Sequence, residues 1–366
     1  MNEKWKRKLK DYYDGNLSDE EVKKIEEELE KLDIYQEYIS EELGPTHPPD
    51  DHTEELPPEK VSKILRSSMR NVRFSLVAYV IMILLLIYPL LTLASFAYYG
   101  WGGKGNDLID VAIETIYVTE PNVSLIGMEV KEDVGLFTLG VNIDLYKRVG
   151  RSDLKYGNWN VSYDLSHARF PDRHYITDSP PDDIPYFDTK KLFHPHAERT
   201  NVDSKAWQTL ENLPNGTVAE VYISLNDLYP VDEMDDLVNG LDLEWRWYAI
   251  DTGFEASGKG VEGGYMAPIG YPAQNDPDSW SPYNKFGSNN EQFMNSLRFL
   301  AKYEEQAVNI ARAKWLDLDE RIEYLEENGL HAYGGVLTGP TKEILKMKED
   351  SNIRLIHLGE VRLWDW

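Results

Sequence analysis

The sequence FSLVAYVIMILLLIYPLLTLASFAYY occupies residues 74–99 and contains no charged side chain. An α-helix rises about 1.5 Å per residue, so this stretch is long enough to cross a hydrocarbon core of about 30 Å. Core helices of soluble proteins are usually shorter and carry a polar face, which this stretch lacks. It therefore predicts one transmembrane helix over residues 74–99, with Pro89 inside it.

The charges on the two sides of this helix predict its orientation. Lys104 is the only cation between the helix and residue 120, whereas five cations precede it closely: Lys60, Lys63, Arg66, Arg70 and Arg73. Because cytoplasmic flanks carry the excess of Lys and Arg, we expect the N-terminus in the cytoplasm. A helix that begins at residue 74 lies too far along the chain for a cleavable signal peptide.

The chain thus divides into four predicted parts. These are a cytoplasmic helical segment over 1–45, a Pro-rich linker and basic juxtamembrane segment over 46–73, the transmembrane helix over 74–99, and an extracellular domain over 100–366. The protein is expected in the cell membrane as a single-pass protein.

Composition excludes several classes of function. The chain has 366 residues, a formal net charge of −26 and no cysteine. Nucleic-acid binding needs a basic face toward phosphate, so this charge argues against a direct nucleic-acid partner. The lack of cysteine excludes disulfides, thiolate zinc sites and a cysteine nucleophile. The outer domain must therefore depend on a buried apolar core, which its length allows.

Two helices are expected before the linker. The first covers residues 3–13 and places Trp5, Leu9 and Tyr12 on one face. A capping box at residues 18–21 begins the second, which runs to about residue 43. Its apolar positions follow the spacing of one helical face and include Val22, Ile25, Leu29, Leu32 and Ile39.

This apolar face has two interpretations. A segment of about 45 residues buries little apolar surface by itself. Either the two helices pack on each other or on a second copy, or the face docks on a partner and folds around it. The pattern of residues alone does not distinguish the two.

The outer part is expected to be an α+β domain, β-rich with a C-terminal α/β layer. The predicted strands are 113–119, 125–130, 136–145, 217–225, 241–250, 333–337 and 353–364. The predicted helices are 292–302, 308–315, 319–328 and 341–348, the last capped by Thr341. Trp245 and Trp247 alternate within a predicted strand and should share one face. Trp364 and Trp366 should dock on the domain surface.

Few patterns in the chain indicate chemistry. It contains no phosphate-binding loop, nucleophile elbow, zinc-protease helix or EF-hand loop. His194 and His196 lack a placed third ligand, and a surface position is the better interpretation of both. The residues His167, Asp172, Arg173 and His174 offer acid–base groups without a pocket. We therefore expect no catalysis, no cofactor and no metal site.

Several stretches resemble a known family. They are ELEKLDIYQEYISEEL (28–43), FAYYGWGGK (96–104), ENLPNGTVAEVYIS (211–224), NSLRFLAKYE (295–304), ENGLHAYGGVLTGPTKEI (327–344) and HLGEVRLWDW (357–366). In these the chain resembles the membrane-anchored anti-sigma factors of the sigma-M type, with paired N-terminal and C-terminal sigma-factor-regulator domains. The resemblance covers nearly the whole chain, and none of its stretches is a catalytic motif.

The resemblance implies a negative regulator that holds an extracytoplasmic-function sigma factor until an envelope signal arrives. It favours the docking interpretation, with Trp5, Leu9, Val22, Ile25, Leu29, Leu32 and Ile39 as the sigma-factor-binding residues. The cysteine-containing zinc signature of another anti-sigma class is absent, so the inner segment must bind without metal. The signal's route stays open between proteolysis, oligomerisation and a second small membrane protein. The alternative function is a membrane-tethered extracellular receptor or enzyme whose inner segment is only an anchor or dimeriser.

Overall fold

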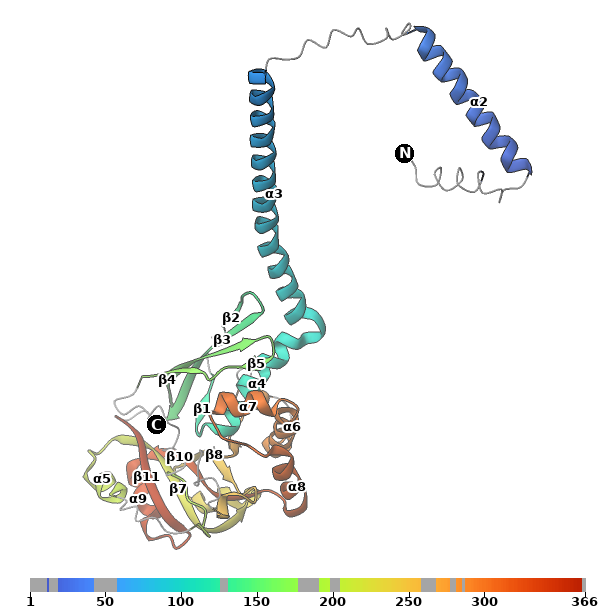
Figure 1. The fold of residues 1–366 in the computed structure, drawn as a ribbon. Helices are drawn as coiled ribbons and strands as arrows, with labels where there is room; N and C mark the ends of the chain where they lie inside the picture. Colours follow the sequence, from blue (N-terminus) through green and yellow to red (C-terminus); the bar gives the residue numbers. More distant parts are fainter. Residues whose placement is uncertain are drawn as a thin grey trace. The chain divides into compact units, whose positions relative to one another are not determined.

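A computed structural model describes Tyr12 and residues 19–42, 58–125, 131–176, 191–197, 205–257, 268–276, 281–284 and 287–363 (Figure 1). The chain forms two units, Met1–Met82 and Ile83–Trp366. The boundary falls within the long helix α3 (Pro58–Gly100), so the second unit contains the end of α3 together with all the strands.

The first unit contains α2 (Asp19–Glu42) and the first part of α3. The predicted second helix is confirmed, and it begins directly after Ser18 of the expected capping box. The predicted helix over 3–13 lies outside the described residues apart from Tyr12, and so does most of the predicted linker.

The predicted long apolar helix is present in α3, which continues through Pro89. The run Val72–Thr119, which includes the end of α3, is long and apolar enough to cross a membrane by length and composition. Its most apolar window is not buried against any other part of the described chain. After Gly100 the chain turns through η1 (Trp101–Gly103), where Gly102 and Gly103 take positive φ angles of 70° and 78°. A left-handed backbone of this kind suits glycine.

The prediction of a strand at 113–119 is wrong, because these residues belong to helix α4 (Lys104–Thr119). Those residues are rich in β-branched side chains, which favours a strand when they are considered alone. Burial overrides the propensity, because Ile113, Ile116 and Val118 are all packed in the core of the second unit. The hydroxyl of Thr115 donates to the carbonyl of Val111 one turn earlier. A hydroxyl that bonds within its own helix is satisfied even when it is buried.

The first sheet lies nearest the end of α3 in Figure 1. It contains β1 (Val123–Ser124), β2 (Lys131–Val134), β3 (Thr138–Val149), β4 (Ser152–Asp164), β5 (His167–Ala168) and β6 (Asp172–Tyr175). Its order is β1-β3-β4-β5, with β2 added on β3 and β6 on β4, and its pairs are antiparallel. The predicted strand 136–145 corresponds to β3, whereas β4 was not predicted. The stretch 126–130 lies outside the described residues.

The second sheet has the order β11-β7-β10-β8-β9 and is also antiparallel. Its strands are β7 (Thr217–Pro230), β8 (Glu244–Ile250), β9 (Gly270–Pro272), β10 (His331–Pro340) and β11 (Ile353–Leu363). The strands predicted at 217–225, 241–250, 333–337 and 353–364 are confirmed. Trp364 and Trp366 lie outside the described residues.

The remaining described elements are short. The helices are α5 (Ala206–Asn212), α6 (Asn289–Ala301), α7 (Glu304–Ala311), α8 (Leu318–Asn328) and α9 (Thr341–Lys346). The 3-10 turns are η3 (Val231–Val238), η4 (Glu255–Ser257), η5 (Pro282–Asn284) and η6 (Met347–Glu349). The large core lies among α4, helices α6 to α8 and both sheets. The unit is therefore a mixed α+β fold in which both sheets are antiparallel.

Two local predictions are wrong for identifiable reasons. Trp245 packs in the large core, whereas Trp247 packs in a smaller cluster with Leu192 and Tyr333. A register shift between β8 and β10 places an extra residue at this point, which turns the two indoles away from each other. Thr341 does not cap α9, because its hydroxyl lies 2.9 Å from the hydroxyl of Thr217.

Candidate functional site

The apolar face of α2 changes character along the helix. Ile25 is buried, Val22 and Leu29 are half-buried, and Leu32 is 53% exposed. Near its start, the hydroxyl of Tyr12 donates to the carboxylate of Glu26 at 3.4 Å. Of the other predicted contact residues, Trp5 and Leu9 lie outside the described residues, as does the side chain of Ile39.

Two further apolar side chains extend this exposed region, namely Tyr35 and Tyr38. Sequence analysis had not singled out Tyr38. Residues three or four positions apart on a helix are neighbours on its surface. The exposed end of the face, defined as Leu32, Tyr35 and Tyr38, is therefore contiguous, and we name it the α2 apolar end. The exposed Ile34 lies about half a turn from Leu32 and outside this face.

Acidic side chains surround the α2 apolar end. The described exposed carboxylates of α2 are those of Glu21, Glu26, Glu27, Glu28, Glu30, Asp33 and Glu37. An apolar patch bordered by acids fits a partner that presents an apolar groove with basic margins. Among the described residues of α2, this arrangement is suited to contact with a protein surface.

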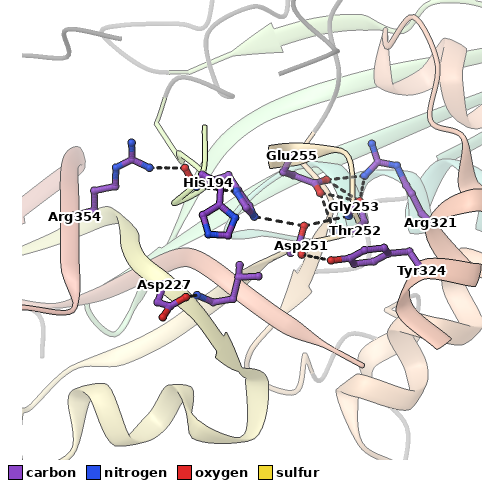
Figure 2. A network of polar contacts seen from close by, with 11 residues as sticks. His194, Asp227, Asp251, Thr252, Gly253, Glu255, Arg321, Tyr324 and Arg354 are labelled. Carbon is purple, nitrogen blue, oxygen red and sulfur yellow. Dashed lines mark hydrogen bonds and ion pairs between the residues drawn. The ribbon is translucent and has the colours of Figure 1, made fainter. Parts of the chain in front are cut away.

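The second unit contains a polar network at the end of β8 (Figure 2). Asp251 accepts hydrogen bonds from the Tyr324 hydroxyl at 2.7 Å and the Gly253 amide at 3.1 Å. His194, which was predicted on the surface, is buried, and its imidazole Nε2 lies 3.5 Å from the carboxylate oxygen that accepts from Gly253. Burial by itself raises the pKa of Asp251, but these three partners outweigh it and lower the pKa below its usual value.

The same network continues to Arg321, which is fully buried. Its guanidinium pairs with Glu255 at 2.7 Å and donates to the carbonyl of Leu316 at 2.5 Å. The Glu255 carboxylate also accepts from the Thr252 amide at 2.7 Å. Figure 2 shows the segment with His194, the end of β8 and helix α8 joined through these groups. They join three separate parts of the chain.

A second buried pair joins the two sheets. Lys147 of β3 lies 3.4 Å from Glu220 of β7, and it donates to the hydroxyl of Tyr222 at 2.9 Å. Burial lowers the pKa of Lys147, but Glu220, Tyr222 and Tyr156 together outweigh it and raise the pKa well above its usual value. Glu220 also accepts from Asn122 at 2.8 Å. Its second carboxylate oxygen accepts from the Glu360 amide at 3.2 Å, so both oxygens of Glu220 are bonded.

The acid–base residues considered in the sequence do not form a catalytic group. His174 pairs with Asp172 at 3.3 Å, and both side chains are about 70% exposed. His167 faces Glu305 at 2.9 Å, again on the surface. Among the residues that the structure describes, no group of three or more His, Asp or Glu side chains is placed to hold a metal ion.

Comparison with known proteins identifies the class of this regulator. Residues 62–154 match the family described as Sigma factor regulator N-terminal, and residues 210–360 match the family described as Sigma factor regulator C-terminal. The chain belongs to this family of anti-sigma factors, which are regulators and not enzymes.

A particular relative covers the whole length. The chain is 35% identical over 370 residues to the "Probable anti-sigma-M factor YhdL" of Bacillus subtilis (strain 168), and the match covers 100% of both chains. No solved structure matches the chain at a significant level.

Proposed function

We propose that this anti-sigma factor sequesters an extracytoplasmic-function sigma factor at the membrane and represses its transcription until an envelope signal arrives. The observation that supports this most directly is the full-length similarity to a relative named for sigma-M. The sigma factor that we propose as the target is of that type. In this proposal residues 1–45 form a cytoplasmic helical domain, α3 crosses the membrane, and residues 100–366 form an extracellular regulatory domain.

The α2 apolar end is the part of the first unit best suited to the contact. It leaves Leu32, Tyr35 and Tyr38 more than half exposed, which for a lone helix in water is unfavourable until a partner covers them. Burial of one such side chain contributes about 2 kcal/mol before the costs of association. The predicted contact residues Val22, Ile25 and Leu29 would then position this end of the helix, with Trp5, Leu9 and Ile39 adding to the same face.

The orientation of α3 follows from charge in this proposal. The cations at Lys60, Lys63, Arg66, Arg70 and Arg73 keep the N-terminal side in the cytoplasm, where a sigma factor resides. Fusion of a reporter that is active only in the cytoplasm to residue 1, and of the same reporter to residue 366, tests this. Activity of the C-terminal fusion would contradict the orientation.

The docking contact is tested with the full-length chain in membranes. Leu32→Asp combined with Tyr35→Asp should abolish co-purification of the sigma factor and release sigma-dependent transcription, because two charges would enter an apolar interface. The matched control is Lys23→Asp, an exposed position on the opposite side of α2 that should leave both readouts unchanged. Full binding by the double variant would remove the α2 apolar end from the contact. Loss of binding by the control would indicate a general effect of charge.

A further inference from the structure

The end of α3 is fastened to two loops of the first sheet. Ser95 and Tyr99 are both buried, although they belong to the uncharged stretch that predicted the membrane helix. The Ser95 hydroxyl accepts a hydrogen bond from the Phe137 amide at 2.8 Å, in the turn between β2 and β3. The Tyr99 hydroxyl lies 2.9 Å from the carbonyl oxygen of Phe137 and 3.1 Å from that of Leu165.

The two loops also hold each other. Leu165 lies in the turn between β4 and β5, and its amide donates to the carbonyl of Phe137 at 2.8 Å. Phe137 and Leu165 both have left-handed backbones, with φ angles of 53° and 55°. Such a conformation is uncommon for large side chains and persists where the surroundings fix it. Figure 1 shows the β2–β3 hairpin beside the last turns of α3.

Each loop nevertheless presents a leucine to its surroundings. Leu136 is 41% exposed and Leu165 is 45% exposed, and Trp101, just past the helix end, is 85% exposed. Leu136 directly precedes Phe137, Leu165 is itself one of the bonded residues, and Trp101 lies two residues after Tyr99. We name these three side chains the apolar rim. It borders the same end of the helix that the hydrogen bonds hold.

The position of these bonds also defines how much of the helix is free to cross a bilayer. From Phe74 to the residue before Ser95 the helix rises about 30 Å, which is the thickness of a hydrocarbon core. Residues 95–99 therefore extend past the length needed to cross the hydrocarbon core. The hydroxyls of Ser95 and Tyr99 bond to the loops of the first sheet at Phe137 and Leu165. The Trp and Leu side chains of the apolar rim lie beside this end of the helix. Such side chains favour the interface between the hydrocarbon core and water.

We infer that the apolar rim inserts into the outer interfacial layer of the bilayer, so that the second unit rests on the lipid surface at the end of α3. The occupant is lipid because the rim is continuous with the helix proposed to span the membrane. This inference rests on that proposed span and is independent of sigma-factor binding.

The lack of cysteine makes a direct test practical. Single cysteines replace Leu136 or Leu165 in the full chain and carry an environment-sensitive fluorophore in nanodiscs of phosphatidylcholine and phosphatidylglycerol. Leu363, a 77% exposed leucine on β11, provides the matched control, and Leu84 of α3 reports the span itself. Brominated lipids quench from within the bilayer, and iodide quenches from water.

We expect labels at Leu136 and Leu165 to lose emission to lipids brominated near the headgroup and to resist iodide. The label at Leu363 should behave in the opposite way, and the label at Leu84 should lose emission to lipids brominated near the acyl end. Quenching of the rim labels by iodide as strongly as at Leu363 overturns the inference. If Leu84 is quenched by lipid in that case, the span holds and only the rim fails. Because Leu165 has a left-handed backbone, the Leu136 variant decides alone if the Leu165 variant does not fold.

Discussion

At the scale of single residues, Lys147–Glu220 is one of the buried charge contacts of the second unit. Glu220→Gln should destabilise this unit by about 3 kcal/mol, because Lys147 would remain buried without its counter-charge. Urea denaturation followed by tryptophan fluorescence measures the effect. The exposed pair Arg298–Glu326 gives the control, in which Glu326→Gln should cost about 0.5 kcal/mol.

A second variant separates charge from packing at the same place. Lys147→Met combined with Glu220→Gln should recover part of the lost stability, since neither residue is then a buried charge and the glutamine oxygen can accept from one of the two donors, Asn122 or the Glu360 amide. A double variant as unstable as Glu220→Gln alone would show that the lysine contributes by packing.

Asp251 gives the unit a dependence on acid. Its folded pKa is lowered, so its contribution to stability is present above the unfolded pKa of about 4 and is lost as the pH falls through the folded value. We expect the stability difference between wild type and Asp251→Asn, on the order of 2 kcal/mol, to shrink as the pH falls below about 4.

Two titratable side chains, Tyr324 and His194, face the Asp251 carboxylate. The hydrogen bond to Asp251, burial and the Asp251 charge raise the pKa of Tyr324 to about 12, so its hydroxyl remains a donor throughout this range. His194 is the other titratable group against the carboxylate. The exposed Asp227 provides the control variant, Asp227→Asn, which removes one surface carboxylate. Parallel curves for the two variants would contradict the assignment.

At the scale of elements, the join between α3 and the first sheet determines what the helix can transmit. Ser95→Ala removes the acceptor of the Phe137 amide, and Tyr99→Phe removes the donor to both loops. Each substitution should lower the stability of the second unit by about 1 kcal/mol. Ser95→Ala should speed amide hydrogen exchange at Phe137, and Tyr99→Phe should speed it in both loops.

Thr92→Ala provides the comparison for this pair of variants. The Thr92 hydroxyl donates only within α3, to the carbonyl of Tyr88, so its loss should leave exchange at Phe137 unchanged. Equal protection of Phe137 in Ser95→Ala and in wild type would mean that the loop is held by its strands alone.

At the scale of the whole molecule, the division into two units predicts that inhibition and outer-domain stability can be separated. Deletion of residues 1–45 should release sigma-dependent transcription while the thermal unfolding of the second unit, followed by near-UV circular dichroism in detergent, stays the same. Transcription unchanged by the deletion would favour the alternative in which the inner segment is only an anchor. A lowered unfolding temperature would show that the two units stabilise each other.

Sequence pattern was most informative where one property repeats over many residues. The uncharged stretch of α3, the amphipathic α2 and the alternating strands β3, β7 and β8 were predicted from periodicity and charge. Prediction failed where distant contacts decide the outcome. The β-branched end of α4 is helical because it is buried, and the register shift beside Trp245 separates two indoles that alternation places together. In the candidate site, the spacing identified the face of α2 but not its exposed end at Tyr38.

By itself, the sequence determined that the chain has one long apolar helix, an acidic amphipathic helix before it and an α+β domain after it. These follow from local composition, because each residue type has its own preference for lipid, water or a helical face. Only the tertiary structure decided that Ser95 and Tyr99 bond to Phe137 and Leu165. Those contacts join residues up to 66 positions apart, and no local pattern encodes which distant carbonyl a buried hydroxyl will meet. The uncharged stretch therefore has two parts: residues up to Ala94 form the candidate membrane span, and the last turn, with Ser95 and Tyr99, belongs to the folded domain.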